Sequence, residues 1–369
     1  MSTERPDSTA GKPRVLVDAT GLGTHVPDIA DADLIELVRA AGRAKDDLVV
    51  VCRPRDAKLF KSFDLQVHRA PDRVRTERSR RVWIEWGLPR LARSLGATVI
   101  HSPHGHFPVF TGVGRVVAVR RGLAVVDRLR RYLSTIKVDV TVPSTAIGDQ
   151  VRALSGLPAN RVHLTPLGVN RDRTAIPSWE AVESVSDLYG ITEWIAVLAS
   201  DEHPDAVTAF RDGFRQATEF SGARPTLIVL GMAESAAVFR FARLVDAGFD
   251  VRIVSELDDS ERSAIIGGSQ FTVVLDDSDE TARPLIDAMA CGAAILSLPT
   301  PALVEVGANV VEYAEPTPAA VEIAVTGLLN NPDRRRELAT AAVTRSHQYS
   351  WDESLAAHRE AWARAAARS

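Results

Sequence analysis

The stretch Asp279-Glu280-Thr281-Ala282-Arg283-Pro284-Leu285-Ile286-Asp287-Ala288-Met289-Ala290-Cys291-Gly292 decides how the rest of the chain is interpreted. The apolar run Phe271–Leu275 before it predicts a buried strand, and residues 293–296 after it begin the next strand. We expect a helix that begins at Pro284, because proline suits the first helical turn, and that ends at Gly292. Strand, acidic loop, helix and strand form one α/β unit, and such units bind ligands where strand carboxyl ends meet helix N-termini.

Acidic residues occupy the expected ligand-binding edge of this unit. Asp279 and Glu280 lie in the loop after the strand. We expect Asp287 in the first turn of the helix, where a carboxylate interacts favourably with the helix dipole.

Length and composition place the chain among globular proteins. Its 369 residues are enough for two domains. Of these residues 45% are hydrophobic and 25% charged, as in ordinary globular proteins. No apolar run approaches the roughly 20 residues of a membrane span, and the polar residues 1–13 predict a disordered tail rather than a secretory leader. The two cysteines, Cys52 and Cys291, predict no disulfide framework. We therefore expect a cytoplasmic protein, and leave open a peripheral attachment to the inner face of the membrane.

The net charge of −4 hides a division of the chain. Arginines dominate residues 69–131, and acids dominate residues 250–315. The segment Arg80–Leu95 predicts a basic helix with Trp83 and Trp86, which would contact a membrane surface, an anionic acceptor lipid or another anionic partner. The interpretation that we favour is a solvated arginine face over a tryptophan pair that faces the core. We expect no nucleic acid, because stacking aromatics are not interleaved with the arginines.

The N-terminal half begins with a strand, Arg14–Ala19, and a glycine turn that contains Gly21 and Gly23. The turn is either a loop that lets backbone approach a phosphate or simply a tight connection from strand to helix. A later strand ends in His101-Ser102-Pro103-His104-Gly105-His106. The three histidines are a weak metal signal, because proline and glycine intervene and no acidic partner is near in sequence, so we expect no metal.

Pro284 to Gly292, with acids at Asp287 and Asp279, resembles the donor-sugar motif of retaining glycosyltransferases with the GT-B fold, the group one or family four kind. That motif reads Glu, then Gly-Phe-Gly-x-Pro, then x-x-Glu-Ala-Met-Ala-Cys-Gly. The run Thr165-Pro166-Leu167-Gly168-Val169-Asn170 resembles the hinge between the two domains of that family. Ser350-Trp351 resembles the step before its C-terminal helix, so the resemblance covers roughly residues 14 to 366.

The resemblance implies two doubly wound Rossmann-like domains facing a cleft, and the alternation of strands and helices predicts the same α/β class. We expect an N-terminal acceptor-side domain over residues 14–170 and a C-terminal donor-side domain over residues 171–349. A last helix within residues 350–369 would cross back to the first domain.

The resemblance also implies a nucleotide sugar as donor, an acceptor of unknown kind, and no cofactor or metal. Asp287 would bind the ribose of the nucleotide, and Asp279, beside Glu280, would contact the donor sugar. Gly231 lies in a region that would hold the nucleotide base through backbone groups.

On the acceptor side, the resemblance assigns Gly21 and Gly23 to close backbone approach to the donor phosphates and the acceptor. His104 would line the cleft near the acceptor. Arg120 stands where the family has a histidine close to the reacting sugar.

The chain departs from the family at the residues that grip the donor diphosphate. Ser200 and Asp205 occupy the positions of an arginine and a lysine. Unit charges about 4 Å apart interact by about 4 kcal/mol at an effective dielectric constant near 20, so the change opposes diphosphate binding. Arg283 would stand in for the lost basic pair.

Two functions therefore stay open from the sequence. The first is retaining glycosyl transfer from a nucleotide sugar. The second is a catalytically degenerate GT-B protein that binds an anionic protein, a lipid or an active glycosyltransferase, which the charge division favours.

Overall fold

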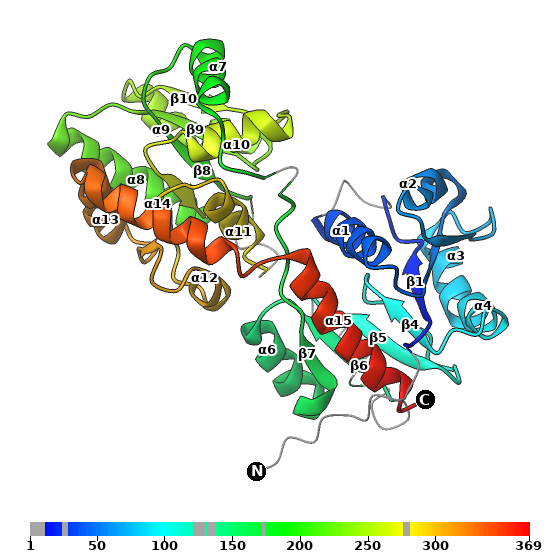
Figure 1. The fold of residues 1–369 in the computed structure, drawn as a ribbon. Helices are drawn as coiled ribbons and strands as arrows, with labels where there is room; N and C mark the ends of the chain where they lie inside the picture. Colours follow the sequence, from blue (N-terminus) through cyan, green and yellow to red (C-terminus); the bar gives the residue numbers. More distant parts are fainter. Residues whose placement is uncertain are drawn as a thin grey trace. The chain divides into compact units, whose positions relative to one another are not determined.

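The computed structural model describes residues 12–23, 29–120, 130, 137–171, 174–201, 203–275 and 281–369. The chain divides into two compact units. The first runs to Pro166 and resumes at Trp351–Ser369, and the second is Leu167–Ser350. The divisions expected from the sequence fall at 170/171 and 349/350. Figure 1 shows the elements of each unit. The expected cleft between the units stays a prediction.

The first unit is built on a parallel sheet whose strand order is β3-β2-β1-β4-β5-β6-β7. Its central strands are buried along their whole length, as expected for a parallel sheet that is covered on both faces. The chain winds outward in both directions from β1, so the sheet is doubly wound and its switch point lies between β1 and β4. The strands are β1 Val15–Ala19, β2 Leu48–Cys52, β3 Gln66–Arg69, β4 Val99–Ser102, β5 Gly114–Ala118, β6 Asp139–Val142 and β7 Val162–Leu164.

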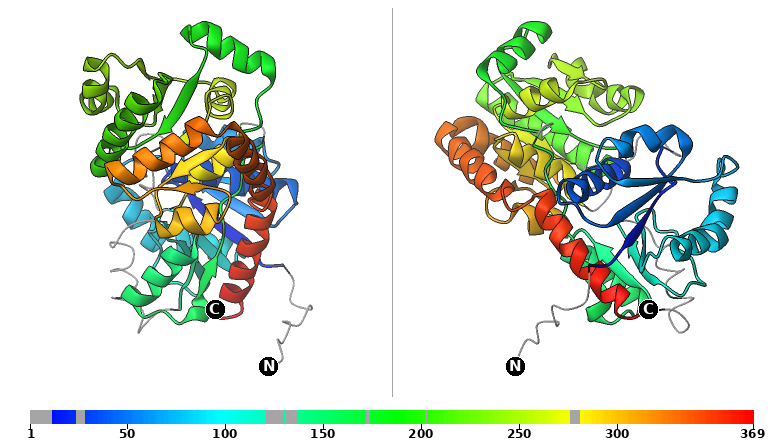
Figure 2. Two further views of the ribbon diagram at one scale, coloured as in Figure 1. Left: turned by 90° about the vertical axis from the view of Figure 1, so that its left-hand side faces the viewer. Right: turned by 45° about the vertical axis from the view of Figure 1, so that its right-hand side comes forward.

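The helices of the first unit include one that comes from the far end of the sequence. Helix α15 packs against β4 to β7 and beside α1, and Figures 1 and 2 show it lying along this sheet. It is anchored there by Trp362, which is almost fully buried. The helices are α1 Ile29–Arg43, α2 Ala57–Lys61, α3 Glu77–Val82, α4 Leu88–Ser94, α6 Thr145–Ser155 and α15 Trp351–Ala366, with short turns η1 Pro54–Asp56, η2 Trp83–Gly87 and η3 Ala159–Arg161.

The second unit is built on a parallel sheet whose order is β10-β9-β8-β11-β12-β13, with its switch point between β8 and β11. Its strands are β8 Trp194–Leu198, β9 Thr226–Leu230, β10 Val251–Ile253, β11 Thr272–Val274, β12 Ile295–Ser297 and β13 Glu312–Tyr313. Its helices are α7 Trp179–Tyr189, α8 Pro204–Ser221, α9 Glu234–Asp246, α10 Asp259–Gly267, α11 Arg283–Ala290, α12 Pro301–Gly307, α13 Pro318–Asn330 and α14 Pro332–Ser346.

The expectation of a tryptophan pair facing the core is wrong for Trp86. Trp83 is half-buried and packs against the core cluster of the first unit, whereas Trp86 is 58% exposed. The reason is the helical spacing: the buried positions along this segment are Arg80, Ile84, Leu88, Pro89 and Ala92. Trp86 therefore lies on the opposite side of the helix from the core.

Among the described residues, no helix combines the length and the apolar character that crossing a membrane requires.

Candidate functional site

The carboxyl edge of the second sheet offers a crevice at its switch point. Consecutive connections leave β8 and β11 toward opposite faces, so their loops diverge, and ligands of doubly wound sheets bind between such loops. Ala199 and Ser200 follow β8 on this edge. Asp279 and Glu280, which the sequence analysis places in the loop after β11, lie outside the described residues.

Ser200 sits at this switch point with a hydroxyl that could serve a ligand. The residue is 9% exposed, and its Oγ has no hydrogen-bond partner among the described residues. A buried hydroxyl without a partner costs free energy, so such a group commonly marks a binding site or an ordered water.

Gly231 brings a second loop close to the first. It follows β9 with a φ of +90°, and a Cβ there would lie 2.7 Å from the carbonyl oxygen of Ala199. Only glycine fits this conformation and this spacing. The loop that carries Gly231 therefore lies directly against the residue that precedes Ser200.

Helix α8 begins on the same edge. Pro204 occupies its first turn, and His203 is its N-cap without a side-chain capping bond. Asp205 is exposed in the first turn, where its carboxylate is stabilised by the helix dipole. The N–H groups of this turn would suit a phosphate, but the Asp205 charge opposes one.

A cavity of about 380 Å³ adjoins the start of α8. Its lining includes His203, Asp205, Thr300 and Glu315. The carboxylates of Asp205 and Glu315 make this cavity unfavourable for an anionic ligand.

Arg283 and Asp287 lie together on α11. The Arg283 Nη1 donates a hydrogen bond to the Gly168 carbonyl at 2.5 Å, and its Nε lies 3.8 Å from the Asp287 carboxylate. Arg262 lies 3.9 Å from the same carboxylate. Arg283 is thus already engaged, which weakens the expectation that it replaces the lost cationic pair.

The expected placement of Asp287 in the first helical turn is wrong. Helix α11 begins at Arg283, after Ala282 in a left-handed conformation, and its first turn holds no acidic residue. Two arginines rather than the helix dipole therefore stabilise the Asp287 charge.

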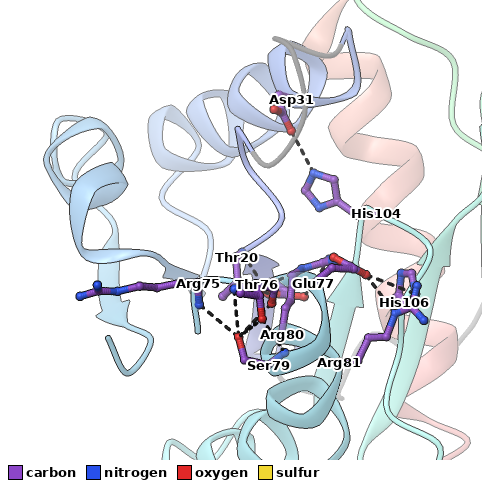
Figure 3. A network of polar contacts seen from close by, with 11 residues as sticks. Thr20, Asp31, Arg75, Thr76, Glu77, Ser79, Arg80, Arg81, His104 and His106 are labelled. Atoms are coloured by element: carbon purple, nitrogen blue, oxygen red, sulfur yellow. Dashed lines mark hydrogen bonds and ion pairs between the residues drawn. The ribbon is translucent and has the colours of Figure 1, made fainter. Parts of the chain in front are cut away.

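The carboxyl edge of the first sheet carries the glycine turn after β1. Gly23 has a φ of +60°, and a Cβ on Gly21 would lie 2.7 Å from the Nδ1 of His104. The turn therefore brings backbone and the His104 ring into close contact at the switch point between β1 and β4. Figure 3 shows His104 with its hydrogen-bond partner, Asp31.

His104 is held by Asp31. The two lie 3.0 Å apart through the histidine Nε2, and the other carboxylate oxygen of Asp31 accepts the Gly23 N–H at 2.8 Å. Burial raises the pKa of Asp31, but the hydrogen bonds from His104 and Gly23 outweigh it and leave the pKa below its ordinary value. The paired carboxylate favours the tautomer with hydrogen on Nε2, which leaves Nδ1 as an acceptor.

Arg120 does not point freely into the site. Its guanidinium forms an ion pair with Asp33, a side chain with no exposure, and its positive charge also helps to lower the pKa of Asp31. Removing Arg120 would therefore leave the buried Asp33 charge uncompensated.

Sequence reasoning missed Arg80, which is buried at the same switch point. Its Nε donates to Thr20 at 3.3 Å, its Nη2 lies 3.7 Å from Asp18, and its Nη1 lies 3.4 Å from Glu77. Figure 3 shows this network beside His104, with Glu77 also contacting Arg81 and His106. The signal in the sequence was the helical spacing that places Arg80 on the same side of the segment as the apolar residues Ile84 and Leu88.

Within the described part of the chain, no three His, Cys, Asp or Glu side chains are grouped closely enough to hold a metal ion. His101, the first histidine of the predicted cluster, is buried against His358 and Trp362 instead.

Two doubly wound parallel units in this order define the GT-B class of fold. The sequence model of glycosyltransferase family 4 matches residues 34–173, and a model described as glycosyl transferase-like matches residues 230–359. The chain thus resembles the family-four glycosyltransferases in one half and glycosyltransferase-like proteins in the other. No curated protein sequence matches it significantly.

Several solved structures share the fold at low sequence identity. A glycosyltransferase from Rickettsia africae matches with a TM-score of 0.75 at 11% identity, over 97% of this chain and 100% of that one. Sucrose-phosphate synthase from Thermosynechococcus elongatus matches with 0.71 at 14%, over 97% and 100%. Anabaena HepE, solved in complex with UDP and glucose, matches with 0.69 at 12%, over 93% and 98%. At these identities the likeness is one of fold.

Proposed function

We propose that the chain transfers a glycosyl group from a nucleotide sugar to an acceptor, with retention of the anomeric configuration. The donor binds at the carboxyl edge of the second sheet, and the acceptor at the glycine turn and His104 of the first. The observation that carries this proposal is the buried hydroxyl of Ser200 at the switch point of the second sheet, for which the described residues supply no hydrogen-bond partner. The UDP and glucose bound to the fold relative HepE support a nucleotide sugar as the donor.

The proposed reaction exchanges one bond at the anomeric carbon for another. The bond between the anomeric carbon and the diphosphate oxygen breaks, and the diphosphate keeps the electron pair. The acceptor hydroxyl forms the new bond to the anomeric carbon on the face that the diphosphate leaves, and its proton passes to the leaving diphosphate oxygen. Asp287 binds the ribose hydroxyls, and Asp279 and Glu280 contact the donor sugar, as the family resemblance implies.

The leaving diphosphate is the weak point of this site. Ser200 offers one neutral donor and Asp205 a negative charge where the family has two cations. We therefore expect donor binding that is weak, and weaker still at low ionic strength, where the repulsion between Asp205 and the diphosphate is least screened.

One observation favours a second candidate, binding of a partner without transfer. Arg283 is committed to the Gly168 carbonyl and to Asp287, so this cation cannot meet a phosphate without breaking those contacts. In this alternative the fold of a glycosyltransferase serves as a scaffold.

Donor turnover separates the two candidates. The protein is incubated with UDP-sugars and GDP-sugars, with and without simple sugar acceptors, and the released diphosphate and the anomer of the product are followed by NMR. A product of retained configuration, and loss of turnover in Asp287→Ala, would support the proposal. The control is Asp333→Ala, which removes a carboxylate at the start of α14 and should leave turnover unchanged. If no donor releases its diphosphate, the result favours the second candidate, a scaffold that binds a partner without transfer.

A further inference from the structure

A continuous helical segment from α3 through η2 to α4 presents an outward face that the proposed function does not use. Its exposed positions, three or four residues apart, are Arg78, Val82, Trp86, Arg90 and Arg93, and we call this set the Trp86 face. Val82 is 64% exposed and Trp86 58%. Positions spaced in this way form one stripe along a helix.

The backbone holds Trp86 in this exposed position. Pro89 has no N–H, and its ring would clash with the carbonyl four residues earlier in a regular α-helix. The wider π turn at Trp83–Gly87 relieves that clash. Arg90 then donates from Nη1 to the Trp86 carbonyl at 2.8 Å, and its guanidinium lies 5.8 Å from the centre of the indole ring.

The charge on this face is not neutralised by its neighbours. Residues 70–95 contain three acids. Glu85 accepts the Val109 N–H at 2.9 Å, Glu77 faces Arg80, Arg81 and His106, and the Asp72 carboxylate, before α3, forms no ion pair among the described residues. Arg78 and Arg93 form no ion pair among the described residues, and both are exposed. The face is therefore an apolar strip, Val82 and Trp86, flanked by arginines that have no acidic partner in the described part of the chain.

We propose that the Trp86 face docks on the surface of an anionic lipid bilayer. Tryptophan is favoured at membrane interfaces because its ring is apolar at one end and polar at the other, and arginines alongside it reach lipid phosphates. Nucleic acid fits less well, because a single exposed aromatic gives no stacking platform. This docking goes beyond the proposed function and does not depend on it.

The test is flotation of the full chain with lipid vesicles. Wild type should bind vesicles rich in phosphatidylglycerol, bind phosphatidylcholine vesicles far more weakly, and lose binding at high salt. Trp86→Ala should weaken binding about tenfold through lost apolar burial. Because each arginine contributes about fivefold near an anionic surface, Arg78→Glu/Arg93→Glu should weaken binding about a hundredfold or more.

Matched controls come from the second unit. Trp179 is 74% exposed on α7 beside Glu180, and the Arg336 side chain is 77% exposed on α14. Trp179→Ala and Arg336→Glu should leave vesicle binding unchanged. All the altered side chains are exposed, so circular dichroism should show every variant folded.

Three results would overturn the proposal. They are no binding of wild type to anionic vesicles, equal binding to neutral vesicles, and equal effects of Trp86→Ala and Trp179→Ala. Binding of an acidic protein or an oligonucleotide through this face, in the absence of vesicle binding, would also replace the lipid with another partner.

Discussion

Gly231 shows how one residue shapes the candidate donor edge. Its φ of +90° and the 2.7 Å separation between a Cβ at this position and the Ala199 carbonyl oxygen leave no room for a side chain. The loop after β9 can therefore lie against the loop after β8, which carries Ser200. Backbone groups at such close contacts can reach a ligand that side chains would exclude.

Gly231→Ala should destabilise the protein by about 2 kcal/mol, through backbone strain and the clash with Ala199. Gly327 on α13 is the matched control, since a Cβ there meets nothing within 4 Å. Gly327→Ala should stabilise the helix by roughly 0.5–1 kcal/mol. Urea unfolding measures the stability of both variants. The same change in the free energy of unfolding at the two sites would contradict this reasoning.

His358 gives the first unit a pH-dependent stability. It is buried against His101 and Trp362, and its Nδ1 contacts the Ser354 carbonyl at 2.8 Å. Burial lowers the pKa of His358 from its ordinary value to about 4, and burial with the nearby His358 charge lowers the pKa of His101 as well. The folded state therefore requires both rings to be neutral.

Stability should fall as the pH is lowered from about 6.5 toward 4, because the unfolded chain binds protons there and the folded chain does not. His358 alone contributes about 1.4 kcal/mol per pH unit in that window, so roughly 2 kcal/mol is lost by pH 5. Hydrogen exchange of the α15 amides at several pH values measures this loss. His358→Asn keeps a donor but cannot titrate, and an unchanged pH slope in that variant would show that His358 is not the cause.

At the scale of elements, Arg115 on β5 ties neighbouring loops to the sheet. Its guanidinium donates to the carbonyls of Pro108, Val109, Thr111 and Lys137 at 2.9 to 3.0 Å. The residue is 8% exposed, and burial lowers its pKa. A planar fork with several donors is the group that can serve so many carbonyls at once.

Arg115→Lys should therefore cost about 2–4 kcal/mol, because a single ammonium leaves buried carbonyls without a donor. Arg93→Lys on α4, where the side chain is exposed, should change stability by less than about 0.5 kcal/mol. The urea midpoints of the two variants measure this contrast. Similar midpoints would mean that solvent or backbone shifts satisfy the carbonyls.

Elements with strong local signals could be predicted from the sequence. Strand β1 occupies Val15–Ala19 and strand β11 occupies Thr272–Val274, within the apolar runs that predict them. The outward face of Trp86 could not be predicted, because Arg80 on the buried side and Trp86 on the exposed side reverse the usual relation between polarity and burial. Tertiary contacts, such as those of Arg80 with Asp18 and Thr20, decide that orientation.

At the scale of the molecule, the sequence predicts two doubly wound units because strands and helices alternate in both halves, and the sheet orders confirm this class. The candidate site was less predictable. The hydrogen bond from Arg283 to Gly168 joins residues 115 positions apart, and no local pattern reveals it. It changes Arg283 from an expected phosphate ligand into a residue that is already engaged.

The charges at the carboxyl edge of the second sheet decide whether the molecule can bind a nucleotide diphosphate. A nucleotide diphosphate would meet Ser200 and Asp205 instead of two cations. If the second sheet keeps a nucleotide-sugar site, restoring those cations should strengthen binding without any other change, since one reversed contact is worth several kcal/mol before solvent screening.

Calorimetric titration of UDP and GDP into wild type and Ser200→Arg/Asp205→Lys, at low salt, tests this central claim. The account predicts weak binding by wild type, binding by the double variant that is at least about tenfold tighter, and a gain that shrinks as salt is added. Glu180→Lys, which repeats the charge change of Asp205→Lys in the first turn of α7, should leave the affinity unchanged. No heat with either nucleotide in the double variant, or an equal gain from Glu180→Lys, would contradict a nucleotide site on this edge.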